Sequence, residues 1–263
     1  MFTKRLVFLA ATTLLATACG RAAELDSAED ADESAVVTSA ESALTVNLSD
    51  EVAQPVSATA EDLAASAVAR VPMTMTTPSC VTATQMGATV TYVLTDCTGP
   101  YGLVHVTGTL TAVYSRGMGG AVQVVITGNG IKANAATFDV NATVNATQAA
   151  GVKRAQVTSQ SSGTGPRGAS VDRTGSYTVT WDAANECVTL DGSWETTVAL
   201  RKATTTVAHF KKCAGQCPAA GGSIVYTGAR GTVVTLTYDG SATATWTSSA
   251  NGRTGTVKLL CGG

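Results

Sequence analysis

Apolar and polar residues alternate along much of the chain. Between positions 104 and 114 the even positions are mostly apolar and the odd positions are mostly polar. Between 138 and 147 the alternation runs without a break. A period of two is typical of a β-strand with one buried face and one solvent-facing side. The pattern therefore predicts a protein built mainly from strands.

Turn signals separate these alternating segments. Three glycines between 117 and 120 can supply positive φ, and Asp239-Gly240 and Asn251-Gly252 favour hairpin turns. The scarcity of aromatic residues, 5% of the chain, favours many short strands with shallow packing. About twelve strands result, with no helix after residue 70. We expect an all-β domain over residues 70–263, an antiparallel meander that forms a sandwich or a strongly curved sheet.

Two parts of this domain are similar to each other. Cys80-Val81-Thr82 recurs as Cys187-Val188-Thr189, and each is followed by a strand pair and a second cysteine. This similarity suggests an internal repeat of two β units, residues 80–150 and 187–261. Chance similarity among strands rich in Thr and Val explains the pattern equally well.

Residues 1–19 have the features of a lipoprotein signal peptide. A basic start is followed by an apolar run, Leu6 to Leu15, which is too short to span a bilayer. The small residues before Cys19 resemble the lipobox of bacterial lipoproteins, with Ala16 where leucine is commoner. The resemblance implies cleavage before Cys19 and its modification by fatty acids such as palmitate, which together give stable membrane anchoring. An ordinary secretory signal peptide with an incidental Cys19 is the alternative.

The next segment, residues 20–69, differs in composition from everything after it. It holds eleven acidic residues and one basic residue, Arg21, among Ala, Ser, Thr and Val. Low hydrophobicity and repelling charge predict a disordered, acidic, Ala/Ser-rich tether. Within it, Thr59 and Asp62 form a capping-box pattern that predicts a short helix over 60–69.

Charge is divided unequally along the chain. Eleven of the 19 acidic residues lie in the tether and eight lie from Arg70 onward; three of the 17 basic residues precede Arg70 and 14 lie from there onward. One interpretation is a basic face that meets an anionic envelope polymer. We favour the other, in which scattered basic residues are simply solvated. No aromatic ladder accompanies the densest basic pairs, such as Lys153-Arg154 and Lys211-Lys212, so nucleic-acid binding is not expected.

Six cysteines remain when Cys19 is set aside, and an exported protein is expected to hold them in disulfides. They are Cys80, Cys97, Cys187, Cys213, Cys217 and Cys261. Proximity favours a bond between the first two. The other four allow three pairings, and analogy with the first half favours Cys187 with Cys213 and Cys217 with Cys261.

One group of these residues has a second interpretation. His209, Cys213 and Cys217 form an H-x3-C-x3-C pattern, which suggests zinc, and the two cysteines suggest a redox pair. The spacing is not C-x-x-C, and exported thiols are oxidised, so structural disulfides are the favoured interpretation. We expect neither a metal nor a cofactor.

Catalytic motifs are scarce. His105 and His209 are the only histidines, and neither G-x-S-x-G nor H-E-x-x-H occurs. Gly163 to Gly168 matches the dinucleotide pattern G-x-G-x-x-G, but no helix is expected after it. A carboxylate pair assembled in space, as glycosidases require, stays open. We name no catalytic residue, and the balance favours a protein that is not an enzyme.

Three tryptophans raise the question of a sugar-binding platform. Trp181, Trp194 and Trp246 all fall on the apolar phase of their strands. That phase favours core positions for all three.

The chain as a whole resembles uncharacterised β-rich lipoproteins of Gram-negative bacteria, especially of the myxobacterial kind. The similarity rests on the lipobox, the acidic tether and the segments CAGQCPAAGG, VTLTYDGSATATW and GRTGTVKLLC. It covers most of the chain and implies a fold family without an assigned activity.

The function expected from these observations is that of a lipid-anchored envelope lipoprotein, attached through Cys19 and located at the outer membrane, that binds or scaffolds without catalysis. One alternative is a carrier that cradles an apolar ligand or lipid in a curved sheet. A second is a hydrolase with a spatially assembled carboxylate site. A deep apolar concavity would favour the carrier, and a pocket with two close carboxylates would favour the hydrolase.

Overall fold

The computed structural model describes residues 58–70, 78–98, 105–117, 120–149, 151–182, 184–259 and 261. The predicted signal peptide with Cys19, and the acidic tether as far as residue 57, lie outside these described residues.

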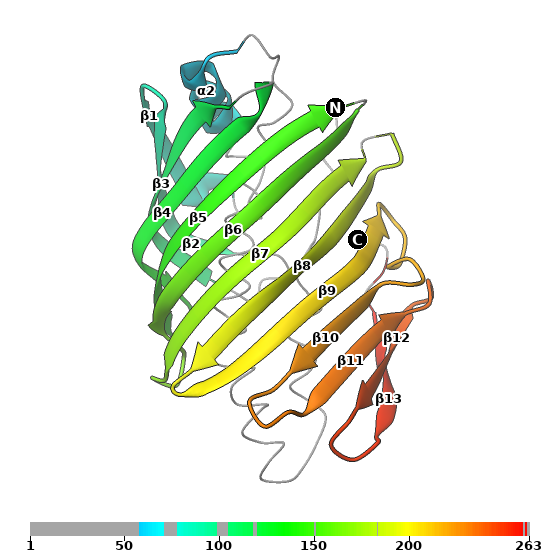
Figure 1. Cartoon of the computed structure of the whole chain (residues 1–263). Helices are drawn as coiled ribbons and strands as arrows, with labels where there is room; N and C mark the ends of the chain where they lie inside the picture. Colours follow the sequence, from blue (N-terminus) through cyan, green and yellow to red (C-terminus); the bar gives the residue numbers. More distant parts are fainter. Residues whose placement is uncertain are drawn as a thin grey trace.

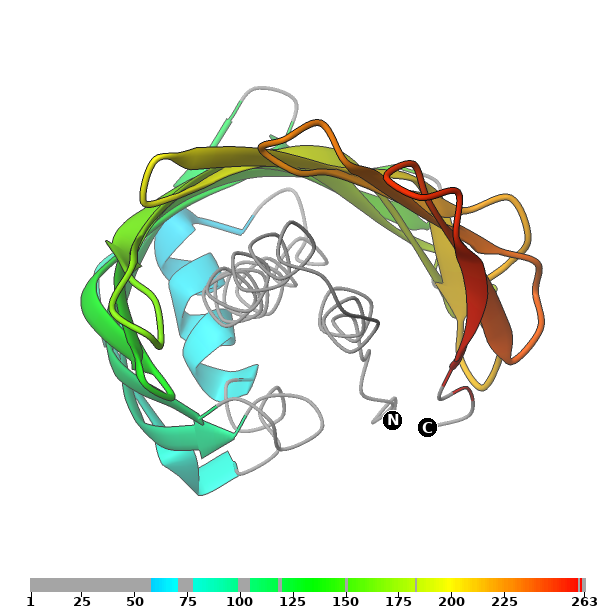
Figure 2. The same cartoon turned by 90° about the horizontal axis from the view of Figure 1, so that it is seen from below.

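Thirteen antiparallel strands form one sheet, in which each strand pairs with its neighbours in sequence. They are β1 (Val81–Met86), β2 (Thr89–Thr98), β3 (His105–Arg116), β4 (Val122–Ala133), β5 (Ala136–Ala149), β6 (Val152–Thr164), β7 (Ser170–Asp182), β8 (Cys187–Val198), β9 (Arg201–Cys213), β10 (Ser223–Thr227), β11 (Val233–Tyr238), β12 (Thr243–Ser248) and β13 (Thr254–Lys258). The strands lie side by side in one layer (Figure 1), and that layer curls into an open arc (Figure 2). The predicted antiparallel meander is confirmed, and it is a strongly curved sheet and not a sandwich.

The middle strands are longer than the composition led us to expect. Strands β3 to β9 have 12 to 14 residues each. Small side chains limit the depth of a core, but they do not limit backbone pairing, and each of these strands hydrogen-bonds to a neighbour on both sides. Backbone hydrogen bonding along long strands therefore stabilises the sheet where large core side chains are scarce.

The helix predicted over residues 60–69 is present as α2 (Ala60–Arg70), and a short 3-10 helix, η4 (Pro78–Cys80), leads into β1. The Thr59 N–H donates to Asp62 Oδ2 at 2.8 Å, and the Asp62 N–H donates to Thr59 Oγ1 at 3.1 Å, which completes the capping box. Two donors to the Asp62 carboxylate, first the backbone N–H of Thr59 and then its hydroxyl at 3.0 Å, hold the pKa of Asp62 below its ordinary value.

Helix α2 lies inside the arc, against the first strands (Figure 2). Its Leu63, Ala64 and Ala67 are buried in the same apolar cluster as the inward residues of β1 to β3. Two polar contacts fix its start: Arg116 Nε donates to the Ala58 carbonyl and Gln85 Nε2 donates to the Glu61 carbonyl, both at 2.9 Å. The helix therefore marks the concave face of the sheet as the apolar one.

Register shows that one apolar row crosses nearly the whole concave face. Because residues paired across antiparallel strands have side chains on the same face, such a row can be followed from strand to strand. It runs through Tyr114, Val124, Val144, Val157, Tyr177, Gly192, Val207, Ile224, Leu236, Trp246 and Gly255.

Curvature comes from glycines and β-bulges. Five large inward residues are paired with a glycine on a neighbouring strand: Leu110 with Gly128, Phe138 with Gly163, Trp194 with Gly175, Tyr177 with Gly192, and Trp246 with Gly255. A Cβ built at Gly192 would lie 2.3 Å from the Cβ of Tyr177, so the tyrosine occupies the space that another side chain would need. Register shifts in four strand pairs bend the sheet further.

Three disulfides cross-link the chain, one at the first hairpin and two in the region from β8 to the C-terminal end of the described chain. They join Cys80 to Cys97, Cys187 to Cys213 and Cys217 to Cys261, which are the pairings that the sequence favoured. The first closes the β1–β2 hairpin and the second closes the β8–β9 hairpin, so each lies at the start of one of the two suggested β units. The duplication itself stays a prediction.

Candidate functional site

The concave face changes in chemical character between β5 and β6. Two adjacent rows of paired residues, all buried except the half-buried Gly175, are aliphatic on β2 to β5, apart from Tyr92, and become polar on β6 to β8. The first row is Tyr92, Leu110, Gly128, Val140, Ser161, Arg173 and Thr196, and the second is Val90, Ala112, Ile126, Ala142, Ser159, Gly175 and Trp194. We name the residues Ser159, Ser161, Arg173, Trp194 and Thr196 the Arg173 cluster.

Arg173 lies at the centre of this cluster. Only 4% of its surface is exposed, and its Cζ lies 5.4 Å from the ring centroid of Trp194, which is cation–π distance. Its Nη1 donates to Thr196 Oγ1 at 3.5 Å. On the other side, the Trp194 ring lies 5.2 Å from the ring of Tyr177. Trp194 is therefore held between a guanidinium and an aromatic ring, both from β7.

Gly175 is what allows the indole of Trp194 to lie across β7. A Cβ at Gly175 would be 2.7 Å from Trp194 Nε1 and 2.9 Å from Ser159 Oγ, so both polar atoms converge over this glycine. Trp194 and Ser159 are each 7% exposed, and neither atom makes a hydrogen bond within the described part of the chain. Buried polar groups are normally hydrogen-bonded, so two such atoms side by side point to a partner that the described residues do not supply.

Sequence patterns alone do not identify these residues as a site. A signal was present in β7, where Arg173 stands on the same phase as the apolar Val171, Tyr177 and Val179. An arginine among buried positions costs free energy unless its charge is satisfied, so it is rarely placed there without a role. What the sequence could not show is that Ser159 and Trp194 come from neighbouring strands to the same place.

Charge is sorted between the two faces of the sheet. Within the described strands the concave phase carries five basic residues and no Asp or Glu. The five are Arg116, Lys153, Arg173, Arg201 and Lys212. The strand acids Asp139, Asp172, Asp182, Asp191 and Glu195 fall on the convex phase, together with five basic residues, and Asp96 lies in the β-bulge of β2. Basic residues that look scattered in the sequence therefore give the concave face one sign of charge.

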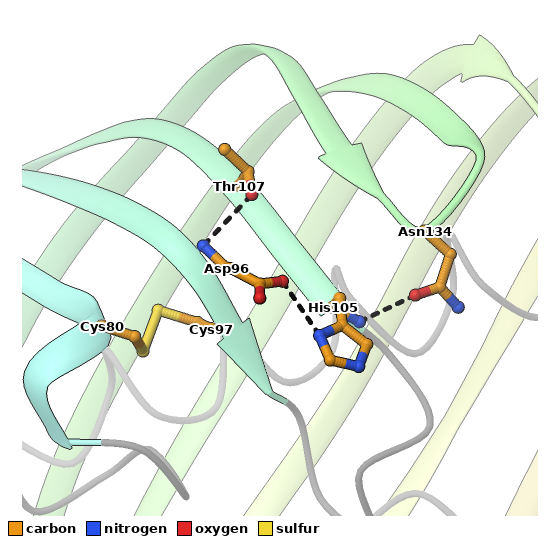
Figure 3. Close-up of polar contacts among 6 residues, drawn as sticks. All are labelled: Cys80, Asp96, Cys97, His105, Thr107 and Asn134. Carbon is orange, nitrogen blue, oxygen red and sulfur yellow. Dashed lines mark hydrogen bonds and ion pairs between the residues drawn. A yellow bond between two sulfur atoms is a disulfide. The ribbon is translucent and has the colours of Figure 1, made fainter.

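The two histidines each pair with an aspartate at a β-bulge. His105 Nδ1 lies 2.9 Å from Asp96 Oδ1, and the Asp96 N–H donates to Thr107 Oγ1 at 3.2 Å (Figure 3). Both side chains are largely exposed, 50% for His105 and 74% for Asp96. The ring of His105 is thus paired with a carboxylate at Nδ1, and a hydrolytic triad would also need a nucleophile within reach of Nε2.

His209 is arranged in the same way at the β8–β9 bulge. The backbone N–H of His209 donates to Asp191 Oδ1 at 2.7 Å, and the ring Nδ1 lies 3.4 Å from the same oxygen. The cysteines of the H-x3-C-x3-C pattern are bound elsewhere, Cys213 to Cys187 and Cys217 to Cys261. Among the described residues no group of three or more His, Cys, Asp or Glu side chains is placed to hold a metal ion.

Two carboxylates do share a face. Asp139 and Asp172 stand in one row on the convex side, with Ser162 between them, so their backbones are about 10 Å apart across two strand spacings. Asp139 Oδ1 accepts a hydrogen bond from the Gly130 N–H, and both residues are exposed. An exposed, convex face does not exclude water, and this weakens the hydrolase alternative.

The three tryptophans do not form a platform. Trp194 is buried, and Trp181 and Trp246 are partly buried against the core. Near the C-terminal end of the concave face, burial raises the pKa of Tyr238 to about 12, so its hydroxyl stays neutral and is no candidate for a general base.

No protein-family model, curated protein or solved structure matches this chain. Within the described residues no helix is both long enough and apolar enough to cross a bilayer.

Proposed function

We propose that the protein is a lipid-anchored, non-catalytic binding protein of the cell envelope, and that it holds an apolar ligand against the concave face of its curved sheet. The observation that carries this proposal is the apolar row from Tyr114 to Trp246, which continues across ten strands while the described helix α2 contacts mainly β1 to β3. Along this row Val157, Tyr177, Val207, Ile224 and Leu236 are buried on strands beyond those that α2 contacts, which supports the concave face as a surface for apolar contact.

The anchor rests on the lipobox pattern that ends at Cys19. Lipidation there would place the domain at the membrane surface, at the outer membrane in the resembling lipoproteins. Such a location suits a protein that receives or passes on apolar molecules, because their source is a bilayer. Labelling cells with a radioactive fatty acid should mark the natural protein and not a Cys19→Ser variant; label retained by the variant would overturn the anchor.

Binding can be tested with neighbouring substitutions on opposite faces of β9. Ala203 is half-buried on the concave phase, and Thr204 is exposed on the convex phase. A tryptophan at Ala203 fills the space in which a ligand would lie, so Ala203→Trp should weaken binding of a fluorescent long-chain alcohol by roughly tenfold. Thr204→Trp is the matched control and should bind as the natural protein does.

Two results would contradict the proposal. Failure of the natural protein to bind the fluorescent alcohol at all would remove the carrier function. Equal weakening by Ala203→Trp and Thr204→Trp would show that the ligand does not lie on the concave face. The thermal unfolding midpoint of each variant shows whether the domain remains folded.

A further inference from the structure

Every second hairpin of the sheet turns at the same end, because consecutive strands of a meander run in opposite directions. From β6 onward four hairpins share one end, β6–β7, β8–β9, β10–β11 and β12–β13, and they follow one another along the lower side of the sheet in Figure 1. Each carries one exposed arginine in or beside its turn: Arg167, Arg201, Arg230 and Arg253. We name these four residues, together with Leu200, the arginine rim. Successive turns of the rim are separated by two strand spacings, about 10 Å.

We propose that the arginine rim is a membrane-docking surface, which binds the phosphate groups of anionic lipids while Leu200 enters the bilayer. This inference goes beyond the proposed ligand and does not rest on it, because it concerns one end of the strands and not the concave face. It gives the domain an orientation, with the end that carries the rim toward the lipid.

The turns at the two ends of the sheet differ in charge. Within the described turns at the end of the rim there is no Asp or Glu, and within those at the other end there is no Lys or Arg, while two of them carry Glu186 and Asp239. From β6 onward the strands bring two acids near the rim, Asp172 and Glu195, and one further base, Lys202, which lies 2.6 Å from Glu195. Five basic residues against two acidic ones leave this end positive. Charge complementarity therefore selects the rim for contact with an anionic surface.

Two of the turns hold their arginine in the same way. Residues 165–168 and 228–231 share the sequence G-x-R-G. In each, the N–H of the last glycine donates to the carbonyl of the first, at 3.0 Å in the β6–β7 turn and 2.9 Å in the β10–β11 turn, and the last glycine has a positive φ of 91° and 77° respectively. The same tight turn thus places an arginine at the tip of two separate hairpins.

Arginine suits phosphate at these positions. Its guanidinium is a planar, charged fork that binds phosphate with two parallel hydrogen bonds. It carries five N–H donors, so a contact that one of these side chains makes within the protein leaves its charge and its other donors for the lipid. In contrast to the buried Arg173, the four arginines of the rim are exposed at the surface.

Leu200 favours a lipid surface over a soluble anionic polymer. It is 97% exposed at the tip of the β8–β9 hairpin, where only Ala199 and Leu200 separate the paired residues Val198 and Arg201. Two-residue turns favour Asn and Gly, and Ala199 has a positive φ of 55°, so turn chemistry does not account for an apolar pair at this place. An exposed apolar side chain followed by two basic ones matches a membrane interface, which takes up apolar side chains and attracts Lys and Arg.

The test measures by tryptophan fluorescence whether the rim enters a bilayer. Full-length Leu200→Trp protein is added to phosphatidylcholine vesicles, with or without phosphatidylglycerol, whose acyl chains carry bromine and quench a tryptophan inside the bilayer. On the anionic vesicles we expect quenching at least about twofold greater than for the natural protein, and less on the neutral vesicles. An acyl anchor at Cys19 would bring the chain to both kinds of vesicle alike, so the difference between them reports the rim.

A tryptophan at the other end of the sheet is the matched control. Gln216 is exposed in the connection between β9 and β10, and Gln216→Trp should be quenched no more than the natural protein on either kind of vesicle. The thermal unfolding midpoint of each variant shows that the domain remains folded.

The contribution of charge is tested in the Leu200→Trp chain. Replacing three arginines of the rim together, by Arg167→Gln, Arg230→Gln and Arg253→Gln, should lower quenching on anionic vesicles to the level on neutral ones. Added salt should act in the same direction, because it screens exposed charges, and this measurement keeps the test decisive if the triple variant does not fold.

The matched charge control removes three basic residues from the other end of the strands. Lys153→Gln, Arg154→Gln and Lys211→Gln change the net charge by the same amount and should leave the quenching of Leu200→Trp unchanged.

Three results would overturn the proposal. The first is equal quenching of Leu200→Trp and Gln216→Trp, which would show that the rim does not enter the bilayer. The second is equal quenching on neutral and anionic vesicles, which would remove the role of the arginines. The third is retention of the natural protein on a dextran sulfate column without any quenching by vesicles, which would assign the rim to an anionic polymer. None of these results bears on binding at the concave face, so the proposed function is tested separately.

Discussion

The two halves of the concave face share one sheet and one register but differ in what they present. Over β1 to β5 the inward residues are almost all apolar, and α2 lies over the first three strands with Leu63 fully buried. The polar atoms there are matched within the chain, as in the hydrogen bond of 3.1 Å between the hydroxyls of Tyr92 and Tyr114. Over β6 to β8 the same rows hold Arg173 and two hydroxyl-bearing serines.

This difference separates a structural core from a candidate binding face. In the half over which α2 lies, apolar contact is sufficient, because the helix and the strands bury apolar side chains against each other. The other half keeps the polar atoms Ser159 Oγ and Trp194 Nε1 at buried positions without a hydrogen bond from the described residues, which costs stability unless something satisfies them. We therefore look for structural effects in the first half and for ligand effects in the second.

The largest effect is expected from the disulfide that closes the longest loop. Cys217 and Cys261 are 44 residues apart, against 17 for Cys80 and Cys97. In the chain-entropy description, replacing both members by serine should lower the free energy of unfolding by about 4 kcal/mol for the first pair and about 3 kcal/mol for the second. Urea unfolding of the two double variants measures this. A larger loss from the Cys80 pair would show that the α2 end depends on its staple more than loop length predicts.

Truncating Leu63, a residue of α2 that is buried against the sheet, should affect one half of the concave face only. Leu63 of α2 is completely buried between the helix and the sheet, so Leu63→Ala leaves a cavity and should lower the free energy of unfolding by about 3 kcal/mol. Amide hydrogen exchange should accelerate in β1 to β3 and stay unchanged in β6 to β8. Glu61→Ala, at an exposed position on the same helix, is the control. Equal acceleration across the sheet would mean that the two halves unfold as a single unit.

Glycines in the two halves should differ in their tolerance of a methyl group. At Gly192 a Cβ would meet the Cβ and the backbone of Tyr177 at 2.3 and 2.7 Å, and backbone cannot move away easily. At Gly128 the contact of 2.5 Å is with the mobile end of Leu110. We expect Gly192→Ala to cost about 2 kcal/mol and Gly128→Ala about 1 kcal/mol or less in thermal unfolding. The reverse order would mean that the polar half is the more adaptable one.

The smallest effect concerns the acid sensitivity of the helix cap. Hydrogen bonds from Thr59 lower the pKa of Asp62 in the folded protein below its ordinary value of 3.8. A depressed carboxyl pKa stabilises the fold at pH values above the unfolded pKa, and this contribution is lost as the pH falls through the folded pKa. As the pH falls from about 5 to about 1, the free energy of unfolding should therefore decrease less for Asp62→Asn than for the natural protein. Identical acid profiles would show that the cap does not contribute.

Local patterns were sufficient to predict the strands, their antiparallel order and the capped helix. The alternation after residue 104 gave antiparallel strands in sequence order, and Thr59 with Asp62 gave a capped helix at the right place. Both depend on neighbours within a few residues, so the sequence contains the whole cause. The choice between a sandwich and a curved sheet depended on register shifts and on glycines facing large residues across strands, which no single strand reveals.

In the candidate site, the sequence determines the phase of each residue on its strand, and the pairing of the strands determines which residues meet. By themselves, the residues determine that β7 carries an arginine on its apolar phase and that three tryptophans fall on apolar phases. Only the pairing of β6, β7 and β8 decides that Ser159 and Trp194 meet over Gly175, because a shift of one residue would turn either side chain to the convex face. The single sign of charge on the concave phase of the strands has the same origin: each basic residue is placed by its own strand's phase, but the concave surface exists only once thirteen strands have paired.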